Sequence, residues 1–265
     1  MKILFSESKA DYGNYIFPYA VWGFPEPGET PADFFNQGFL PSSRDLDRFY
    51  LCRQVRVNLK KYRASSENRR ILRKGHGFGV ELIPRGAFDY TPQRRQLYKT
   101  YADIKFGKDT MPYSRLDALF NSKITSDLLL VTETKSGVEV GTATLFLEPP
   151  AASYYYYAFY DLNYYRQNLG MFMMTSTVTL LAERGFKYLY LGSCYSPNAM
   201  YKTQFTGAEF FNGVRWSTNM EELKYLIRRE DHTRHLLEGE EYLETFYSGE
   251  LGRMVAASPF QVQIK

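Results

Sequence analysis

The residues with the clearest capacity for chemistry lie between Ser153 and Trp216. An aromatic strand ends at Asp161, the loop RQNLG at residues 166–170 opens a methionine-rich helix, and a second strand precedes the pair at residues 201–202. Backbone N–H groups at the start of such a helix favour an anion, because the helix dipole adds partial positive charge there. We therefore expect this region to suit an anionic acyl donor.

The elements around this region predict an α+β fold. A hairpin is expected at residues 128–134 and 139–147, and a strand at residues 154–162 should extend it. Residues 172–184 form a helix of mostly apolar and small side chains, followed by a strand at residues 188–195. Because a strand, helix, strand connection is right-handed, these last two strands should lie parallel.

The N-terminal part is expected to start with a short strand or arm and loops over residues 1–40, where prolines and glycines interrupt any long element. Residues 53–59 then alternate as a half-buried strand, which should point Arg56 out of the core. Ser65 or Ser66 can cap a short helix that follows.

Two further helices carry start signals. Thr91 before Pro92 predicts a helix to about residue 106. Thr218 with Glu221 forms a capping-box pattern for a helix over residues 220–230, and a second helix or docked tail should complete the chain.

Positive charge is concentrated in one segment. Residues 41–74 contain eleven Lys and Arg against three acidic residues, a net charge of +8, whereas the whole chain carries +4. Such a field attracts polyanions, so contact with a nucleic-acid backbone is one interpretation. The other is an ordinary solvated charged face.

Composition excludes several classes of protein. The 265 residues are 44% hydrophobic, as in a folded enzyme, and no run of about 18 apolar residues could cross a membrane. No signal-type N-terminus is present, so we expect a cytoplasmic protein without membrane contact, and a monomer. Cys52 and Cys194 form no CxxC pair, and His232 with His235 would supply only half a metal site, so neither metal nor cofactor is expected.

Several motifs carry a family resemblance. SENRRILRK at residues 66–74, the strand ending in Tyr160 and Asp161, RQNLG, YLYLG at residues 188–192 and MYK at residues 200–202 occur in the order typical of one family. The chain resembles the arginyl-tRNA:protein transferases and bacterial aspartate/glutamate leucyltransferases. It lacks that family's N-terminal cysteine cluster and keeps only Cys52 there, which also argues against metal dependence.

The resemblance implies a GNAT-type acyltransferase fold, with a mixed central sheet flanked by helices. It divides the chain into an N-terminal arm with a basic substrate- and tRNA-binding region (1–84), an acyltransferase core (85–216) and a C-terminal helical extension (217–265). The implied donor is aminoacyl-tRNA carrying Arg or Leu. The implied acceptor is the N-terminal α-amine of a protein or peptide, usually one beginning with Asp or Glu.

Within this scheme, Asp161 would hold the ammonium of the acceptor or accept its proton, unless it is simply a turn or capping residue. Lys202 would bind a phosphate or an acidic side chain, unless it is an ordinary surface lysine. We assign both as candidate catalytic residues. The candidate donor-binding residues are Arg166, Asn168, Gly170 and Tyr201, and the candidates for binding tRNA or the acidic N-terminus are Arg56, Arg69, Arg70 and Arg73.

Two other functions remain open from the sequence. One is a GNAT N-acyltransferase that uses acyl-CoA, or an aminoacyl-tRNA-dependent enzyme that acts on a small molecule. Phe172 argues against acyl-CoA, because it occupies the place of the second glycine in the usual pyrophosphate-binding loop. The other is a non-catalytic RNA-binding protein, in which Asp161→Ala would be silent.

Overall fold

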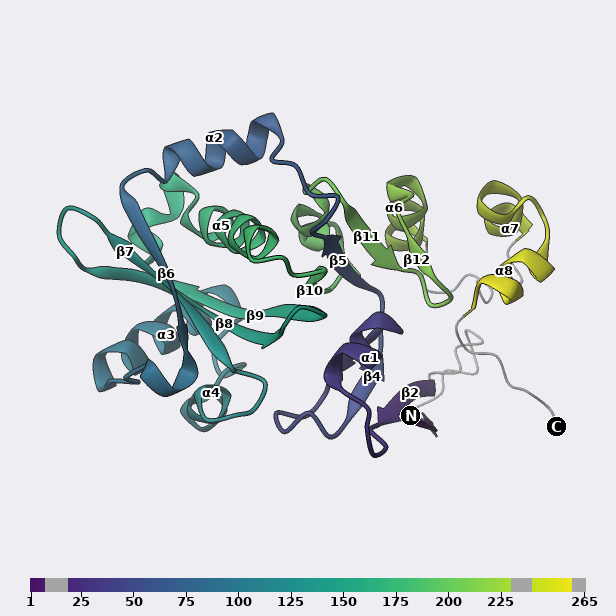
Figure 1. Cartoon of the computed structure of the whole chain (residues 1–265), viewed down its shortest axis with the longest axis horizontal. Helices are drawn as coiled ribbons and strands as arrows, with labels where there is room; N and C mark the ends of the chain where they lie inside the picture. Colours follow the sequence, from purple (N-terminus) through teal and green to yellow (C-terminus); the bar gives the residue numbers. More distant parts are fainter. Residues whose placement is uncertain (8–18, 230–239, 259–265) are drawn as a thin grey trace.

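The computed structural model describes residues 1–7, 19–229 and 240–258. Its central sheet has eight strands: β5 (Gln54–Asn58), β6 (Phe78–Pro84), β7 (Asp127–Glu133), β8 (Glu139–Glu148), β9 (Ala152–Tyr160), β10 (Tyr188–Ser193), β11 (Ala208–Phe211) and β12 (Trp216–Ser217). Their order is β12-β11-β5-β10-β9-β8-β7-β6 (Figure 1). The sheet is mixed: β9 and β10 pair in parallel, as predicted, and every other pair of strands in the described residues is antiparallel.

Helices cover both faces of this sheet, which confirms the predicted α+β class. One face carries α2 (Ser66–Lys74) and α5 (Leu169–Glu183), and the other carries α1 (Pro31–Asn36), α3 (Pro92–Lys105) and α4 (Tyr113–Phe120) (Figure 1). Two successive residues of β8 show the alternation. Gly141 lies against Met173 of α5, whereas the Thr142 hydroxyl lies 2.7 Å from that of Tyr98 in α3.

Two of the three predicted helix caps are confirmed, and the third is wrong. The Ser65 hydroxyl accepts a hydrogen bond from the backbone N–H of Asn68 at the start of α2, and Thr91 caps α3 in the same way. Thr218 was the wrong cap for α6 (Met220–Arg228), because the side chain of Asn219 accepts from the first backbone N–H groups of that helix. Asn is as strong a cap as Ser, and here it lies one residue closer to the helix.

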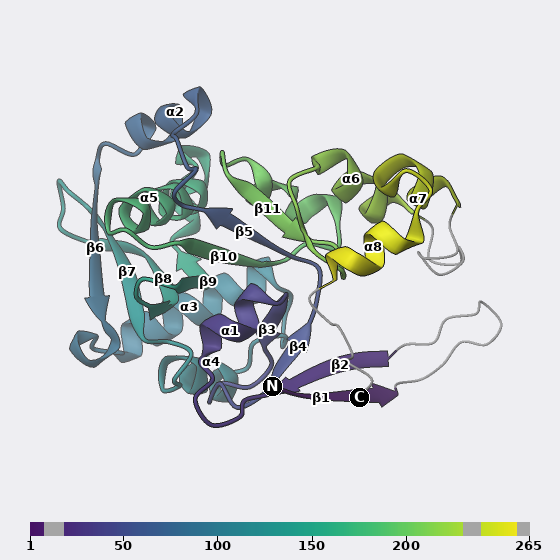
Figure 2. The ribbon, with the colours of Figure 1, turned by 45° about the vertical axis from the view of Figure 1, so that its right-hand side comes forward.

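The N-terminal region contains more structure than an arm with loops. Strands β1 (Lys2–Glu7), β2 (Tyr19–Phe24), β3 (Phe39–Pro41) and β4 (Phe49–Leu51) form a separate antiparallel sheet in the order β1-β2-β4-β3 (Figure 2). Strands β5 and β6 also precede residue 85, yet they lie in the central sheet. The central sheet therefore joins the first two of the three regions predicted from the sequence.

The expected outward orientation of Arg56 is wrong. Its side chain is buried, forms a 2.8 Å ion pair with Glu209 of β11, and lies between the rings of Tyr188 and Trp216, at 3.9 and 3.8 Å from their centroids. The alternating pattern failed because β5 lies between β10 and β11 and is covered on both faces, so even its polar positions are enclosed. Arg56 is thus a structural residue of the sheet.

The C-terminal extension docks through a buried carboxylate. Glu222 of α6 accepts hydrogen bonds from Asn212, Ser217 and, at 2.6 Å, from Tyr242 of α7 (Glu240–Tyr247). Helix α8 (Leu251–Ala257) follows, with Met254 buried. Three hydrogen bonds to one carboxylate offset its removal from water, so α6 and α7 are fixed to the end of the central sheet.

The helices of this fold are short. The longest in the described ranges, α5, has 15 residues. Within those ranges none combines the length and the hydrophobicity required to cross a bilayer.

The Arg56–Glu209 pair predicts a large stability effect. Glu209→Ala should lower the free energy of unfolding by about 3–5 kcal/mol, because it leaves the buried Arg56 guanidinium without a counter-charge. Urea denaturation measures this change. Glu67→Ala is the control, since it breaks an exposed ion pair with Arg70 and should have little effect. Equal effects of the two substitutions would contradict the structural role of Arg56.

Candidate active site

Two bulges end the pairing of β9 with β10. The parallel ladder contains only the pairs Leu189↔Ser153 and Tyr190↔Tyr154. Tyr156 is an extra residue of β9 against β8, and Leu191 is an extra residue of β10 against β5. Since a bulge bends its strand and often lies beside an active site, the point where these strands stop pairing is the candidate centre.

Lys202 reaches this point from the 3₁₀ helix η3 (Pro197–Thr203). Its Nζ donates to the Ser193 carbonyl at 2.7 Å, and no carboxylate lies within ion-pair distance in the described ranges. Gly192 has φ +86°, and a Cβ there would lie 3.6 Å from Lys202 Nζ and 3.8 Å from Tyr154 Oη. Glycine thus allows the strand to turn beside the ammonium of Lys202 and the phenol of Tyr154.

Burial sets the ionisation of this cluster. It lowers the pKa of Lys202, although the nearby Cys194 and Cys52 oppose the shift. It also raises the pKa of the Cys52 thiol to about 12 and that of Cys194 above its ordinary value. Both cysteines are free and protonated at neutral pH, so neither is a thiolate nucleophile.

The predicted donor-binding loop opens α5 as expected. Asn168, with φ +60°, connects the 3₁₀ helix η2 (Leu162–Gln167) to α5, and its carbonyl accepts from Phe172 N–H. The Arg166 side chain is exposed. Gly170 is needed for packing, because a Cβ there would lie 2.9 Å from Tyr160 Cε1. Tyr201 of η3 is 46% exposed and precedes Lys202.

Asp161 lies apart from Lys202. Its carboxylate caps η2 by accepting from Asn163 N–H at 2.9 Å. Six residues of β9 lie between it and Tyr154, so the two Cα atoms are roughly 23 Å apart along the strand at about 3.3 Å per residue. The structure therefore does not bring the two predicted catalytic side chains together.

The basic helix α2 lies beside the donor loop. Arg69, Arg70 and Arg73 are exposed, and Arg70 pairs with Glu67 at 2.6 Å. At the end of α2, Lys74 Nζ donates to the Arg166 carbonyl at 2.7 Å. A positively charged surface thus extends from α2 to the N-terminus of α5.

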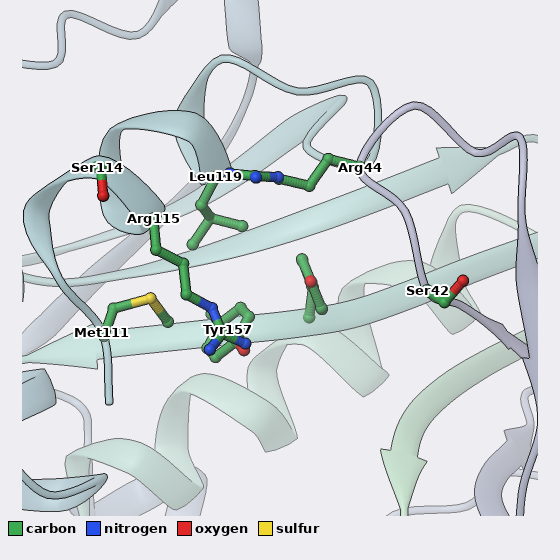
Figure 3. A pocket seen from close by; sticks show the side chains of 8 residues that line it. Ser42, Arg44, Met111, Ser114, Arg115, Leu119 and Tyr157 are labelled. Carbon is green, nitrogen blue, oxygen red and sulfur yellow. The ribbon is translucent and has the colours of Figure 1, made fainter. Parts of the chain in front are cut away.

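Sequence reasoning missed a cavity of about 400 Å³ on the α3 and α4 face of the sheet (Figure 3). No motif indicated it, because two distant loops and the β9 bulge contribute its walls. The one available signal was the tyrosine run at residues 154–157. The cavity is lined by Ser42, Arg44, Met111, Ser114, Arg115, Leu119, Tyr156 and Tyr157.

The described side chains offer no obvious metal centre, since no three His, Cys, Asp or Glu side chains among them gather in a suitable cluster. His76 Nδ1 lies 3.0 Å from the Arg73 carbonyl. His232 and His235, the other candidates from the sequence, lie outside the described residues.

Comparison with known proteins agrees with the motif order. Residues 93–212 match the family profile described as "Arginine-tRNA-protein transferase, C terminus". The aspartate/glutamate leucyltransferase of Ruegeria pomeroyi is 26% identical over 172 residues, covering 62% of this chain and 61% of the relative. That of Alkalilimnicola ehrlichii is 24% identical over 218 residues, covering 73% of this chain and 85% of the relative.

A solved structure, L-PGS from Bacillus licheniformis, aligns with a TM-score of 0.43 at 10% identity, over 55% of this chain and 45% of that one. The match to the Ruegeria pomeroyi relative spans less than two thirds of that relative's length. Residues 93–212 include nearly all of α3, all of α5 and the junction of β9 with β10, so the similarity to the arginyl-tRNA:protein transferases and aspartate/glutamate leucyltransferases covers the candidate centre.

Proposed function

We propose that this chain is an aminoacyl-tRNA:protein transferase that moves an arginyl or leucyl group from tRNA to the N-terminal α-amine of an acceptor protein beginning with Asp or Glu. The observation that carries the proposal lies inside the segment that matches the family profile. There the bulges of β9 and β10 lie beside Lys202, which has no carboxylate partner among the described residues. The 3₁₀ helix η3 that carries Lys202 also contacts the first turn of α5 through its C-cap residue Gln204, which donates to the Met171 sulfur.

The reaction requires position more than a nucleophile from the protein. The acceptor nitrogen attacks the ester carbonyl carbon, a C–N bond forms, and the C–O bond to the ribose breaks. The ribose oxygen takes up one proton and the amine releases one. Since the amine has a reference pKa of about 8, holding both reactants in near-attack geometry can supply roughly 7–11 kcal/mol.

Lys202 is the residue best suited to stabilise the transition state. The ester carbonyl oxygen gains negative charge as the amine attacks, and a nearby ammonium stabilises that charge most strongly where water is excluded. Lys202 is half-buried and has no carboxylate partner among the described residues. For Asp161 we propose a positioning role, in which its cap on η2 holds the donor loop.

The donor is proposed to approach from the α5 face. Arg166, Asn168, Gly170 and Tyr201 would contact its 3′ end, and the exposed Arg69, Arg70 and Arg73 of α2 would contact the phosphate backbone farther away. The Lys74–Arg166 hydrogen bond makes these two regions continuous. Phe172 supports tRNA over acyl-CoA, because it is buried against Gly75 and does not open the loop to a pyrophosphate.

A transfer assay tests this function. Labelled aminoacyl-tRNAs are mixed with peptides beginning with Asp, Glu, Lys or Ala, in parallel with labelled acetyl-CoA as a competing donor. We expect label to move from tRNA to the acidic peptides, and the rate at subsaturating tRNA to fall steeply with added salt. Label moving only from acetyl-CoA would reject the tRNA-dependent function while leaving the fold unchanged.

Lys202 predicts a distinct pH dependence. The rate should rise as the acceptor amine loses its proton near pH 8, then fall as pH passes through the lowered pKa of Lys202, below the ordinary value of about 10.4. Lys202→Met should reduce kcat by about 10²- to 10³-fold. Lys202→Arg should keep more activity and lose the alkaline fall, because arginine stays charged. An unchanged kcat and pH profile in Lys202→Met would contradict the assigned role.

Gly170 predicts a combined effect on packing and on donor binding. In Gly170→Ala the new Cβ would displace the Tyr160 ring, so we expect a stability loss of about 1–3 kcal/mol and a higher KM for the donor. Gly252→Ala, in α8 and with open space around it, is the matched control; it should leave the KM unchanged and raise stability by up to about 1 kcal/mol, since alanine is the better helix former. Thermal unfolding and donor titration measure the two effects. A Gly170→Ala variant that matched the control in both would refute the close packing of α5 on β9.

A further inference from the structure

The cavity beneath α4 is positively charged. Its lining includes two arginines and no carboxylate. Arg44 and Arg115 extend into it from opposite walls (Figure 3). In the described ranges, the side chain of Arg44 has no hydrogen-bond or ion-pair partner, and that of Arg115 has only the Thr110 carbonyl, at 3.3 Å. Two guanidinium groups without counter-charges create a site for an anion.

The remaining lining supplies hydrogen-bond donors. Burial raises the pKa of Tyr156 to about 12, although the charges of Arg115 and Arg44 oppose the shift, so its hydroxyl is protonated at neutral pH. Both guanidinium groups therefore act on this hydroxyl. Ser114 adds a further hydroxyl, whereas that of Ser42 already donates to the Arg48 carbonyl at 3.1 Å. An anion in the cavity would meet two positive charges and several O–H groups.

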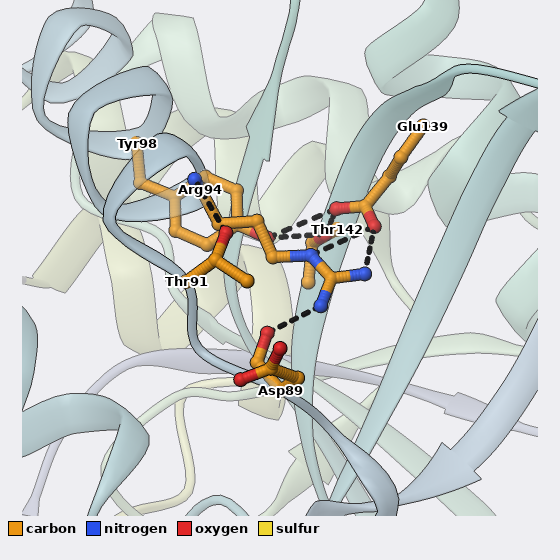
Figure 4. A network of polar contacts seen from close by, with 6 residues as sticks. All are labelled: Asp89, Thr91, Arg94, Tyr98, Glu139 and Thr142. Carbon is orange, nitrogen blue, oxygen red and sulfur yellow. Dashed lines mark hydrogen bonds and ion pairs between the residues drawn. The ribbon is translucent and has the colours of Figure 1, made fainter.

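The wall that carries Arg115 is held rigidly. Arg94 of α3 pairs with Glu139 of β8 at 2.6 Å, and the Tyr98 hydroxyl also donates to Glu139 (Figure 4). Arg95, next along α3, makes two hydrogen bonds to Asp117 of α4, at 2.7 and 2.9 Å. The sheet thus positions α3, and α3 positions α4. These nearby arginines are all paired with carboxylates, which distinguishes them from the two in the cavity.

The cavity borders the reaction centre from the side opposite α5. Tyr156 is the bulge residue of β9, and its ring centroid lies 5.2 Å from that of Tyr154. The Tyr154 hydroxyl and Lys202 Nζ both lie beside Gly192. The donor loop lies on the other face of the sheet, at the N-terminus of α5. With the donor on the α5 face, as proposed above, an anionic group in this cavity would belong to the acceptor.

We propose that this cavity selects the acceptor, with Arg44 and Arg115 binding the side-chain carboxylate of its first residue while its α-amine reaches the end of the β9–β10 pairing. This inference rests on the proposed function and names the residues that confer its acceptor specificity. The alternative occupant, a phosphate near the 3′ end of tRNA, is distinguished by the experiment.

The test compares Arg44→Ala, Arg115→Ala and the control Lys123→Ala in the full chain. Lys123 is exposed and does not line the cavity, and its replacement by alanine removes the same single positive charge as each arginine variant. Steady-state transfer is measured with peptides beginning with Asp, Glu, Asn or Ala. Each arginine variant should lose about 10- to 100-fold in kcat/KM for Asp and Glu peptides, mainly through KM, with little change for Asn and Ala peptides. The control should resemble the unmodified chain.

Arg115→Glu tests whether the charge preference can be reversed. This variant should raise kcat/KM for a peptide beginning with Lys relative to that for a peptide beginning with Asp. Raised KM for the tRNA donor with unchanged acceptor preference would assign the cavity to RNA and overturn the proposal. If the unmodified chain transfers nothing to any peptide, the proposed function fails. Calorimetric binding of the Asp and Asn peptides then tests the cavity by itself, and equal affinities of the two peptides, or no loss of affinity for the Asp peptide in Arg115→Ala, would reject it.

Discussion

The separation of β9 from β10 is the constraint on which the rest of this structure depends. A parallel ladder that continued past Tyr154 and Tyr190 would hydrogen-bond the backbone groups of both strands to each other. The extra residues Tyr156 and Leu191 prevent this, one on each strand. Gly192 then turns with positive φ, and Lys202 approaches the strand end from η3.

The buried ion pair of β5 supports the same point. Arg56 pairs in register with Tyr190, the last residue of β10 before the bulge, and its guanidinium is held by Glu209 and by two aromatic rings. A buried charge pair contributes little net stability compared with apolar packing, but it disfavours other registers, since any shift would bury an unpaired charge. We interpret this pair as fixing the strand position that produces the bulge.

Positively charged side chains lie on both faces of the central sheet, and we assign a different role to those on each face. On the α5 face, α2 presents exposed arginines beside the donor loop and is joined to it through Lys74. On the other face, Arg44 and Arg115 enclose a small cavity. The concentration of charge in residues 41–74 therefore combines residues of different roles: Arg44 in the cavity, Arg56 in the sheet, and the exposed arginines of α2.

Local signals predicted most of the central fold. Ser65 and Thr91 cap the helices they precede, and the order of strand, helix and strand correctly indicated that β9 and β10 are parallel. The orientation of Arg56 could not be predicted, because it depends on β11, a strand about 150 residues later in the chain.

The cavity was beyond sequence reasoning for a similar reason. Arg44 lies in the loop between β3 and β4 and Arg115 in α4, and only tertiary packing brings them to the same bulge. Asp161 carried two interpretations in the sequence, and the structure shows the capping geometry.

The most direct test of this account is a crystal structure with a bisubstrate analogue, in which a stable amide joins a 3′-aminoacyl adenosine to a peptide beginning with Asp. We expect the amide to lie beside Lys202 at the end of the β9–β10 pairing, with the adenosine toward α5 and the Asp carboxylate on Arg44 and Arg115. An amide bound away from the end of the β9–β10 pairing, or a carboxylate on the α2 face, would contradict it.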